Sequence, residues 1–154
     1  MIIDVSRTMG EVFGAAGQSK LTIALQATKL LLQQKLLFGK SHEVAMVLMG
    51  SDSSENDLHE MNGGYDHISV IHDLDVVTLD SLRQLDTIKV SKSRADTLDA
   101  VVVAVHMIGE HCGTKKFNKR VFLITDGNGA CSNVEQIPQI QEEINRQNIK
   151  LNIM

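Results

Sequence analysis

Met1-Ile2-Ile3-Asp4-Val5-Ser6-Arg7-Thr8 joins an apolar run to an aspartate and two hydroxyl side chains. Val121-Phe122-Leu123-Ile124-Thr125-Asp126-Gly127 repeats the apolar run and the aspartate. Continuous aliphatic runs of this kind are typical of strands that are buried on both faces of a parallel sheet. In such sheets ligands bind outside the carboxyl ends of the strands. We therefore expect Asp4 and Asp126 at one edge of one sheet, where a ligand would bind.

The rest of the chain alternates between helical and extended patterns. Apolar spacing predicts helices over residues 19–38, 78–85, 97–111 and 134–148, and aliphatic runs predict strands over 43–49, 67–74, 121–125 and 149–154. The polar stretches 51–64 and 90–96 are interpreted as loops. The expected core face of the helix over 97–111 is Leu98, Val101, Val102, Val105 and Ile108.

This order of elements predicts an α/β fold. Strands separated by helices form a doubly wound, mostly parallel sheet that is flanked by helices on both faces. The alternating run 67–74 predicts an edge strand that is antiparallel. A length of 154 residues suits a single domain over residues 1–154. Because Met1-Ile2-Ile3 is short for a central strand, we expect the chain to be part of a longer protein whose first strand begins earlier.

Composition argues against several classes of function. A net charge of −4 does not favour non-specific binding to a nucleic-acid backbone, which is negatively charged. The one basic cluster, Lys115, Lys116, Lys119 and Arg120, is accompanied only by Phe117 and is interpreted as a solvated loop. No apolar run approaches the roughly 18 residues of a membrane span. We therefore expect no membrane contact and only weak contact with DNA.

Catalytic patterns do not emerge either. Cys112 and Cys131 lack the spacing of a metal or redox motif, so a reducing compartment is the expectation. The segment Gly14 to Leu21 lacks the glycine before the lysine that a phosphate-binding loop needs, and its glycines predict a flexible loop. No nucleophile elbow is present, and the histidines are not spaced for shared ligation. The sequence thus predicts a protein that is not an enzyme.

The aspartates with their neighbouring hydroxyls have two interpretations. Asp4-x-Ser6-x-Thr8 offers one carboxylate and two hydroxyl oxygens on alternate residues, a set that suits a hard cation such as Mg²⁺. Alternatively, Ser6 and Thr8 cap the following turn and Asp126 caps a loop by local hydrogen bonds. Thr97 is then the N-cap of its helix. Both interpretations remain open.

Together with Thr97 opening a helix three residues before Ala100, these loops resemble the three loops of a von Willebrand A domain. The resemblance implies a metal-ion-dependent adhesion site in which a bound metal accepts a carboxylate from a partner. It assigns the ligands to Asp4, Ser6, Thr8, Thr97 and Asp126. No cofactor beyond this Mg-type ion is implied.

Further runs resemble the amino-terminal A domain of the larger subunit of Ku. They are Lys35 to Phe38, His42 to Gly50, Asn56 to Leu58, Gly63 to Tyr65, Ala95 to Ala100 and Gly113 to Arg120. The resemblance implies a fragment of a nuclear, DNA-end-binding heterodimer that acts in double-strand-break repair by non-homologous end joining. The partner would be the smaller Ku subunit. DNA would be held by the full assembly, and this domain would recruit repair factors through short peptide motifs.

The Ku resemblance also implies a peptide pocket at Leu58, Tyr65, Asp96 and Val102, which would take a peptide with basic and aromatic residues. By itself, the sequence is equally consistent with Tyr65 as a loop anchor, Val102 as core and Asp96 as a helix N-terminal charge. Ku A domains commonly have a degraded metal motif, whereas this chain keeps suitable residue types at all of its positions. The alternative function is therefore a metal-dependent adhesion or ligand-binding A domain of another protein.

Overall fold

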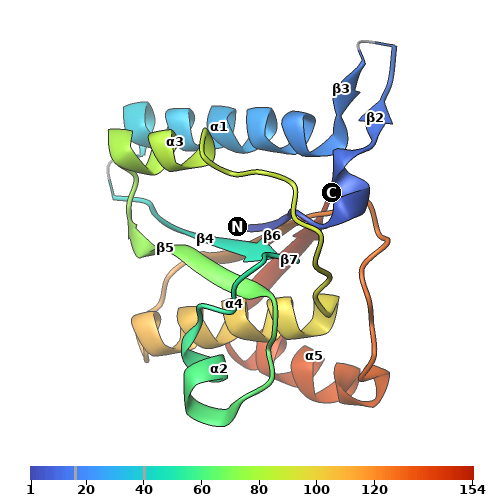
Figure 1. Ribbon diagram of the computed structural model, residues 1–154. Helices are drawn as coiled ribbons and strands as arrows, with labels where there is room; N and C mark the ends of the chain where they lie inside the picture. Colours follow the sequence, from blue (N-terminus) through green and yellow to red (C-terminus); the bar gives the residue numbers. More distant parts are fainter. Residues whose placement is uncertain (16, 40) are drawn as a thin grey trace.

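The computed structural model describes residues 1–15, 17–39 and 41–154. Within them, five strands form the main sheet in the order β5-β4-β1-β6-β7 (Figure 1). They are β1 (Ile2–Asp4), β4 (Glu43–Met49), β5 (Ile68–Val76), β6 (Lys119–Ile124) and β7 (Ile149–Ile153). β1, β4, β6 and β7 run parallel, and β5 pairs antiparallel with β4 at one edge. The predicted α/β fold with an antiparallel edge strand is confirmed.

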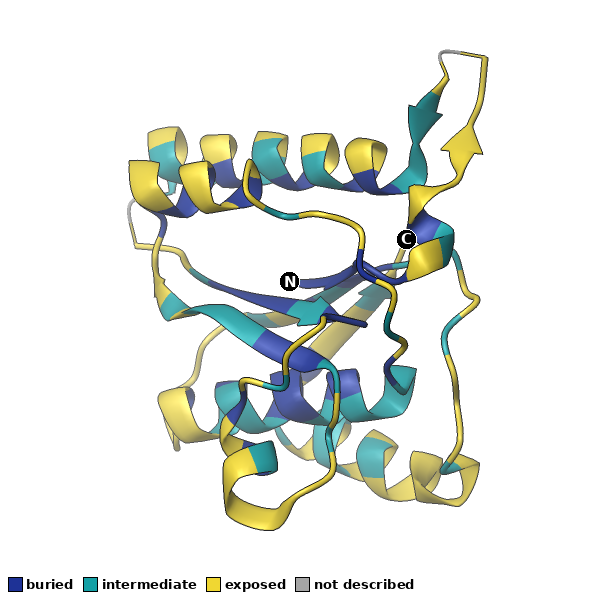
Figure 2. Ribbon diagram, viewed as in Figure 1, coloured by how far each residue is buried: buried dark blue, intermediate teal, exposed yellow. Residues whose placement is uncertain are grey.

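Helices cover both faces of the sheet (Figure 1). α1 (Lys20–Phe38) and α3 (Leu79–Leu85) lie on one face, and α4 (Thr97–Cys112) and α5 (Ile137–Arg146) lie on the other, together with the short α2 (Asp57–Asn62). The sides of α1 and α4 that face the sheet are largely buried and their outer sides are exposed, whereas α5 has no buried residue (Figure 2). None of the helices in this part of the chain is both long and apolar enough to traverse a bilayer.

β1 links the two cores because successive side chains of a strand point to opposite faces. Ile2 belongs to the cluster that includes Val101 and Val105 of α4. Ile3 belongs to the opposite cluster, with Leu21 and Leu32 of α1. β1 is thus buried from both sides and hydrogen-bonded along both edges, and its last residue is Asp4.

Several boundaries follow local capping chemistry. β4 has the predicted bounds, and α1 begins just after Ser19, whose hydroxyl accepts a hydrogen bond from the Thr22 backbone N–H at 3.1 Å. α3 begins just after Thr78, whose hydroxyl accepts from the Ser81 backbone N–H at 3.2 Å. Serine and threonine at these places satisfy backbone donors that the first helical turn leaves unpaired. Such ends can therefore be predicted from sequence.

Other elements differ from the prediction. The stretch 51–64, predicted as a loop, contains α2. The predicted helix over 134–148 begins as a 3₁₀ turn, η2 (Val134–Gln136), and becomes α-helical from Ile137. Pro138 lies in the first turn of α5, the only part of a helix where its missing N–H is not needed.

The core face of α4 is also rotated relative to the prediction. Leu98 and Val102 are only half-buried, whereas Ala100, Val103 and Ala104 are buried together with Val101. The small side chains of Ala100 and Ala104 allow the helix to lie close to the sheet, so the core-facing positions are not only those with large aliphatic side chains. The prediction is confirmed for Val101, Val105 and Ile108 and wrong for Leu98, while Val102 is half-buried and packs against the core cluster.

A 3₁₀ turn and a small hairpin separate β1 from α1. The turn is η1 (Arg7–Gly10), and the hairpin pairs β2 (Val12–Phe13) with β3 (Gln18–Ser19) and projects from the body of the domain (Figure 1). Gly14 and Gly17 have φ of 74° and 66°, a region that glycine adopts without steric cost. The predicted glycine loop is thus partly a paired hairpin, and Ala16 lies outside the described residues.

Asn56 fastens α2 to the sheet. Its side chain is almost fully buried, and its Oδ1 accepts a hydrogen bond from the His59 backbone N–H at 2.9 Å. Its Nδ2 donates to the carbonyl oxygens of Ile68 at 2.8 Å and Tyr65 at 3.2 Å. One side chain therefore caps a helix and holds the Tyr65 loop against the start of β5.

Leu32 and Leu30 provide a matched test of how α1 is oriented. Leu32 is 1% exposed and faces the sheet, whereas Leu30 on the outer side is 68% exposed. Leu32→Ala is expected to lower the free energy of unfolding by about 2–5 kcal/mol, because it leaves a cavity in the core. Leu30→Ala should change it by less than about 0.5 kcal/mol. Urea denaturation measures both, and equal losses would contradict this orientation.

Asn56→Ala removes a buried hydrogen-bonding group and leaves its partners unpaired. We expect a loss of about 1–3 kcal/mol in the free energy of unfolding. The control is Asn62→Ala at the exposed end of α2, which should be close to neutral. A fall in stability for Asn62→Ala as large as that for Asn56→Ala would contradict a specific role for the Asn56 contacts.

Candidate functional site

The first candidate site lies at the carboxyl ends of β1 and β6, which are neighbours in the sheet. Asp4 is fully buried there, and both of its carboxylate oxygens already accept hydrogen bonds. The Ser6 backbone N–H donates to Oδ1 at 2.9 Å, and the Thr125 hydroxyl donates to Oδ2 at 2.7 Å. The buried charge of Asp4 is thus satisfied by the chain itself, as burial requires.

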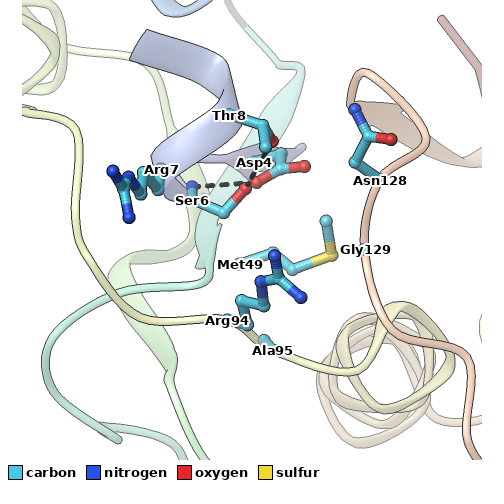
Figure 3. A pocket seen from close by; sticks show the side chains of 9 residues that line it. All are labelled: Asp4, Ser6, Arg7, Thr8, Met49, Arg94, Ala95, Asn128 and Gly129. Atoms are coloured by element: carbon cyan, nitrogen blue, oxygen red, sulfur yellow. Dashed lines mark hydrogen bonds between the residues drawn. The ribbon is translucent and has the colours of Figure 1, made fainter.

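A small cavity of about 10 Å³ opens beside Asp4, with room for about one water molecule. It brings together three of the predicted metal ligands, Asp4, Ser6 and Thr8 (Figure 3). The hydroxyl oxygens of Ser6 and Thr8 lie 3.5 Å apart. Arg94 extends toward this cavity, whereas Arg7 points away from Asp4 (Figure 3). Neither arginine was predicted to take part, because a pattern of carboxylates and hydroxyls gives no signal for a cation.

Asp126 does not line this cavity and is held by other partners. Its Oδ2 lies 2.9 Å from Nζ of Lys20, and the Asn128 backbone N–H donates to its Oδ1 at 3.0 Å. Partial burial alone would raise the pKa of Asp126, but hydrogen bonds from Lys20, Asn128 and Thr8 outweigh it and lower the pKa to about 2. Asp126 therefore caps its own loop, as one interpretation of the sequence predicted, and also forms a long-range ion pair.

Thr97 is absent from the cavity as well. It is the first residue of α4, and the N-cap is Asp96, whose Oδ1 accepts from the Leu98 backbone N–H at 2.8 Å. The interpretation of Thr97 as N-cap is therefore wrong by one residue. The Thr97 hydroxyl lies against Gly129, where any Cβ would collide with it, and Gly129 itself lines the cavity. Thr97 thus lies behind Gly129 and does not itself line the cavity.

This arrangement fits a divalent cation poorly. Mg²⁺ prefers a near-octahedral set of oxygen ligands. Here each Asp4 oxygen already accepts a hydrogen bond, Asp126 is paired with an ammonium group, and Thr97 does not line the cavity. Within the described residues, no group of three or more His, Cys, Asp or Glu side chains is placed to hold a metal ion.

The second candidate site is a groove of about 1080 Å³ along α4. Part of its wall is formed by Leu58 of α2, by Val102 of α4, and by Tyr65 from the loop before β5. Three of the four residues predicted for a peptide pocket therefore meet there. The groove continues along α4 and α5, and is also lined by Val105, His106, Gly109, Glu110, residues 113–119, Glu143, Arg146, Gln147 and Asn148. Asp96 does not line it and instead caps α4 at the N-terminal end.

Tyr65 lies in a loop with an unusual backbone. Its φ is 52°, and that of His67 is 60°, a region that residues other than glycine seldom adopt. The Tyr65 carbonyl is held by Asn56, while the half-buried ring packs against the core cluster that contains Leu58. Such strain is found most often where a loop is held for function. Sequence reasoning pointed to Tyr65 but not to its backbone.

The rim of the groove contains residues that the sequence analysis set aside. Lys115, Lys116 and Lys119 line it together with Phe117, which is about half exposed. These residues were interpreted only as a solvated loop. The one available signal was an aromatic side chain inside a basic run.

Known proteins provide an independent comparison. The chain matches the family described as Ku70/Ku80 N-terminal alpha/beta domain over residues 1–154. It is 32% identical to "X-ray repair cross-complementing protein 5" of Dictyostelium discoideum, covering 88% of this chain and 17% of that protein. It is 30% identical to "ATP-dependent DNA helicase 2 subunit KU80" of Oryza sativa subsp. japonica, covering 79% of this chain and 18% of that one.

The chain spans about a fifth of the length of these relatives. Among solved structures, "Crystal Structure of the SpRpn10 VWA domain" matches with a TM-score of 0.67 over 99% of this chain and 70% of that one. At 13% identity this likeness shows the fold alone. This fold agrees with the expected von Willebrand A-like architecture, and the family match over residues 1–154 agrees with the Ku resemblance. The chain belongs to the family of Ku70/Ku80 N-terminal alpha/beta domains.

Proposed function

We propose that this chain is a non-catalytic interaction module of a nuclear, Ku-like heterodimer that binds DNA ends in double-strand-break repair by non-homologous end joining. Its role is to recruit repair factors through short peptides, while the full assembly with the smaller Ku subunit holds the DNA. Family membership supports the Ku assignment. The single observation that carries the recruitment role is the groove along α4, where Leu58, Tyr65 and Val102 meet.

The groove has the features of a peptide-binding surface. Its wall combines a buried leucine with a half-buried tyrosine and valine, and its rim is polar. Tyrosine is a favoured contact residue because a rigid apolar ring ends in a polar group. A space of this size admits an aromatic anchor together with the neighbouring peptide residues.

Acidic side chains near Tyr65 favour a basic peptide residue at this end of the groove. Lys115, Lys116 and Lys119 line the groove beyond the C-terminal end of α4. Asp66 is exposed beside Tyr65, and Asp96 and Asp99 lie at the start of α4. Burial raises the pKa of Asp99, and the carboxylates of Asp96 and Asp66 raise it further. The three acidic groups are therefore close enough to affect one another, and a lysine or arginine bound near them would relieve their repulsion. This cluster gives Asp96 an electrostatic role although it does not line the groove.

The alternative function is metal-dependent adhesion at the carboxyl edge of the sheet. Asp4, Ser6 and Thr8 meet at one cavity, which is the observation in its favour. The committed oxygens of Asp4 and the ion pair of Asp126 argue against it. The groove along α4 is therefore the favoured recognition site, and recognition there is independent of metal.

Tyr65→Ala tests the groove. Affinity for a peptide with basic residues and one aromatic residue is expected to fall by about 1–2 kcal/mol, the scale of an interface anchor. Isothermal titration calorimetry measures the affinity, and circular dichroism verifies the fold. Phe13→Ala is the matched control, because Phe13 is an exposed aromatic residue on the hairpin and does not line the groove. Wild-type affinity in a folded Tyr65→Ala variant would remove Tyr65 from the site.

Removing metal separates the two functions. The peptide affinity of the wild-type chain is expected to be equal in Mg²⁺ and in EDTA, because the groove contacts proposed here involve no metal ion. The same calorimetric titration in both buffers makes the measurement. Binding that EDTA abolishes would favour metal-dependent adhesion and contradict recruitment by the groove.

A further inference from the structure

Lys20 connects three parts of the chain at the carboxyl edge of the sheet. Its Nζ lies 2.9 Å from Oδ2 of Asp126 and 2.8 Å from Oε2 of Glu11. The Lys20 side chain is 21% exposed and that of Asp126 is 9% exposed, so this contact is largely shielded from solvent. Lys20 thus places a positive charge directly on a carboxylate that the von Willebrand A resemblance assigns to a metal.

The position of Lys20 is unfavourable for the helix that contains it. Lys20 is the first residue of α1, where the helix dipole presents its positive end, and the first turn holds no acidic residue. A cation there raises the energy of the helix unless other groups compensate. Glu11 and Asp126 are those groups, and their hydrogen bonds with Lys20 raise its pKa. Lys20 is therefore positioned by its contacts with the loops and not by helix formation.

The other polar groups around Asp126 and Asp4 already hydrogen-bond to these two carboxylates. Asn128 donates to Asp126 through its backbone N–H and through its side-chain Nδ2, each at 3.0 Å. Asp4 accepts from Ser6 and Thr125, and Arg94 adds a second positive charge near the cavity. A divalent ion that approached Asp126 would have to displace an ammonium group from the same oxygen and would be repelled by it.

We propose that the ammonium group of Lys20 is a resident cation that replaces a divalent metal ion at Asp126, so that this edge of the sheet is closed to Mg²⁺ and Mn²⁺. The segments that contain Glu11 and Asp126 are then held together by the ammonium group of a side chain of the chain itself. Their geometry does not depend on the concentration of metal ions. This inference concerns the carboxyl edge alone and is independent of peptide binding in the groove.

Lys20→Ala tests the inference, with Mn²⁺ and Mg²⁺ as the probes. In the wild-type chain neither ion should change the melting temperature relative to EDTA, and Mn²⁺ should not broaden the amide signals of residues 4–8 and 125–129 selectively. In Lys20→Ala, Mn²⁺ is expected to broaden those signals and to bind at least about tenfold more tightly than to the wild type, because the opposing charge is gone. Mg²⁺ should raise the melting temperature of this variant.

Lys29→Ala is the matched control. Lys29 lies on the same helix and pairs with Asp86 at 2.7 Å, away from Asp4 and Asp126. This variant should therefore respond to metals like the wild type. If Lys20→Ala does not fold, Lys20→Met retains the apolar stem without the charge and takes its place. Selective broadening of the wild type would overturn the proposal. A folded, uncharged Lys20 variant that ignores both ions would overturn it equally.

Discussion

The pairing of β1 on both of its edges is the constraint on which the rest of the structure depends. β1 is only three residues long, yet β4 and β6 bind it in parallel and helices cover both of its faces. Ile2 and Ile3 therefore belong to opposite cores. Parallel pairing also aligns the carboxyl ends of β1 and β6, which brings Asp4 and the Thr125-Asp126 loop to one edge. The first candidate site is a direct consequence of this pairing.

At that edge the chain compensates its own charges. Asp4 is too deeply buried to remain unpaired, and it accepts hydrogen bonds from the Ser6 backbone N–H and the Thr125 hydroxyl. Asp126 receives an ammonium group from the start of α1. Carboxylates that would serve as metal ligands in a von Willebrand A domain here join loops to one another. The same fold can thus keep the residue types of a metal site while committing their oxygens to internal bonds.

The groove arises on the other side of the molecule, from elements that are distant in sequence. α2 contributes Leu58, the loop before β5 contributes Tyr65, and α4, the basic loop and α5 supply the remainder. Asn56 determines the position of Tyr65, because it caps α2 and binds the Tyr65 carbonyl at the same time. A strained backbone at Tyr65 is retained where the surrounding contacts hold it. Recognition at this groove would thus depend on a buried side chain that does not line it.

By itself, the sequence determined the alternation of strands and helices, the antiparallel edge and the shared edge of Asp4 and Asp126. These follow from periodicity and capping, which act over a few residues. α2 was missed because its six residues are too few to display a period. Only the tertiary structure decided that Lys20 reaches Asp126, that Thr97 does not line the cavity, and that Asp96 caps α4 outside the groove. These outcomes depend on contacts between residues far apart in the chain, and no local pattern encodes the reach or direction of a side chain across the fold.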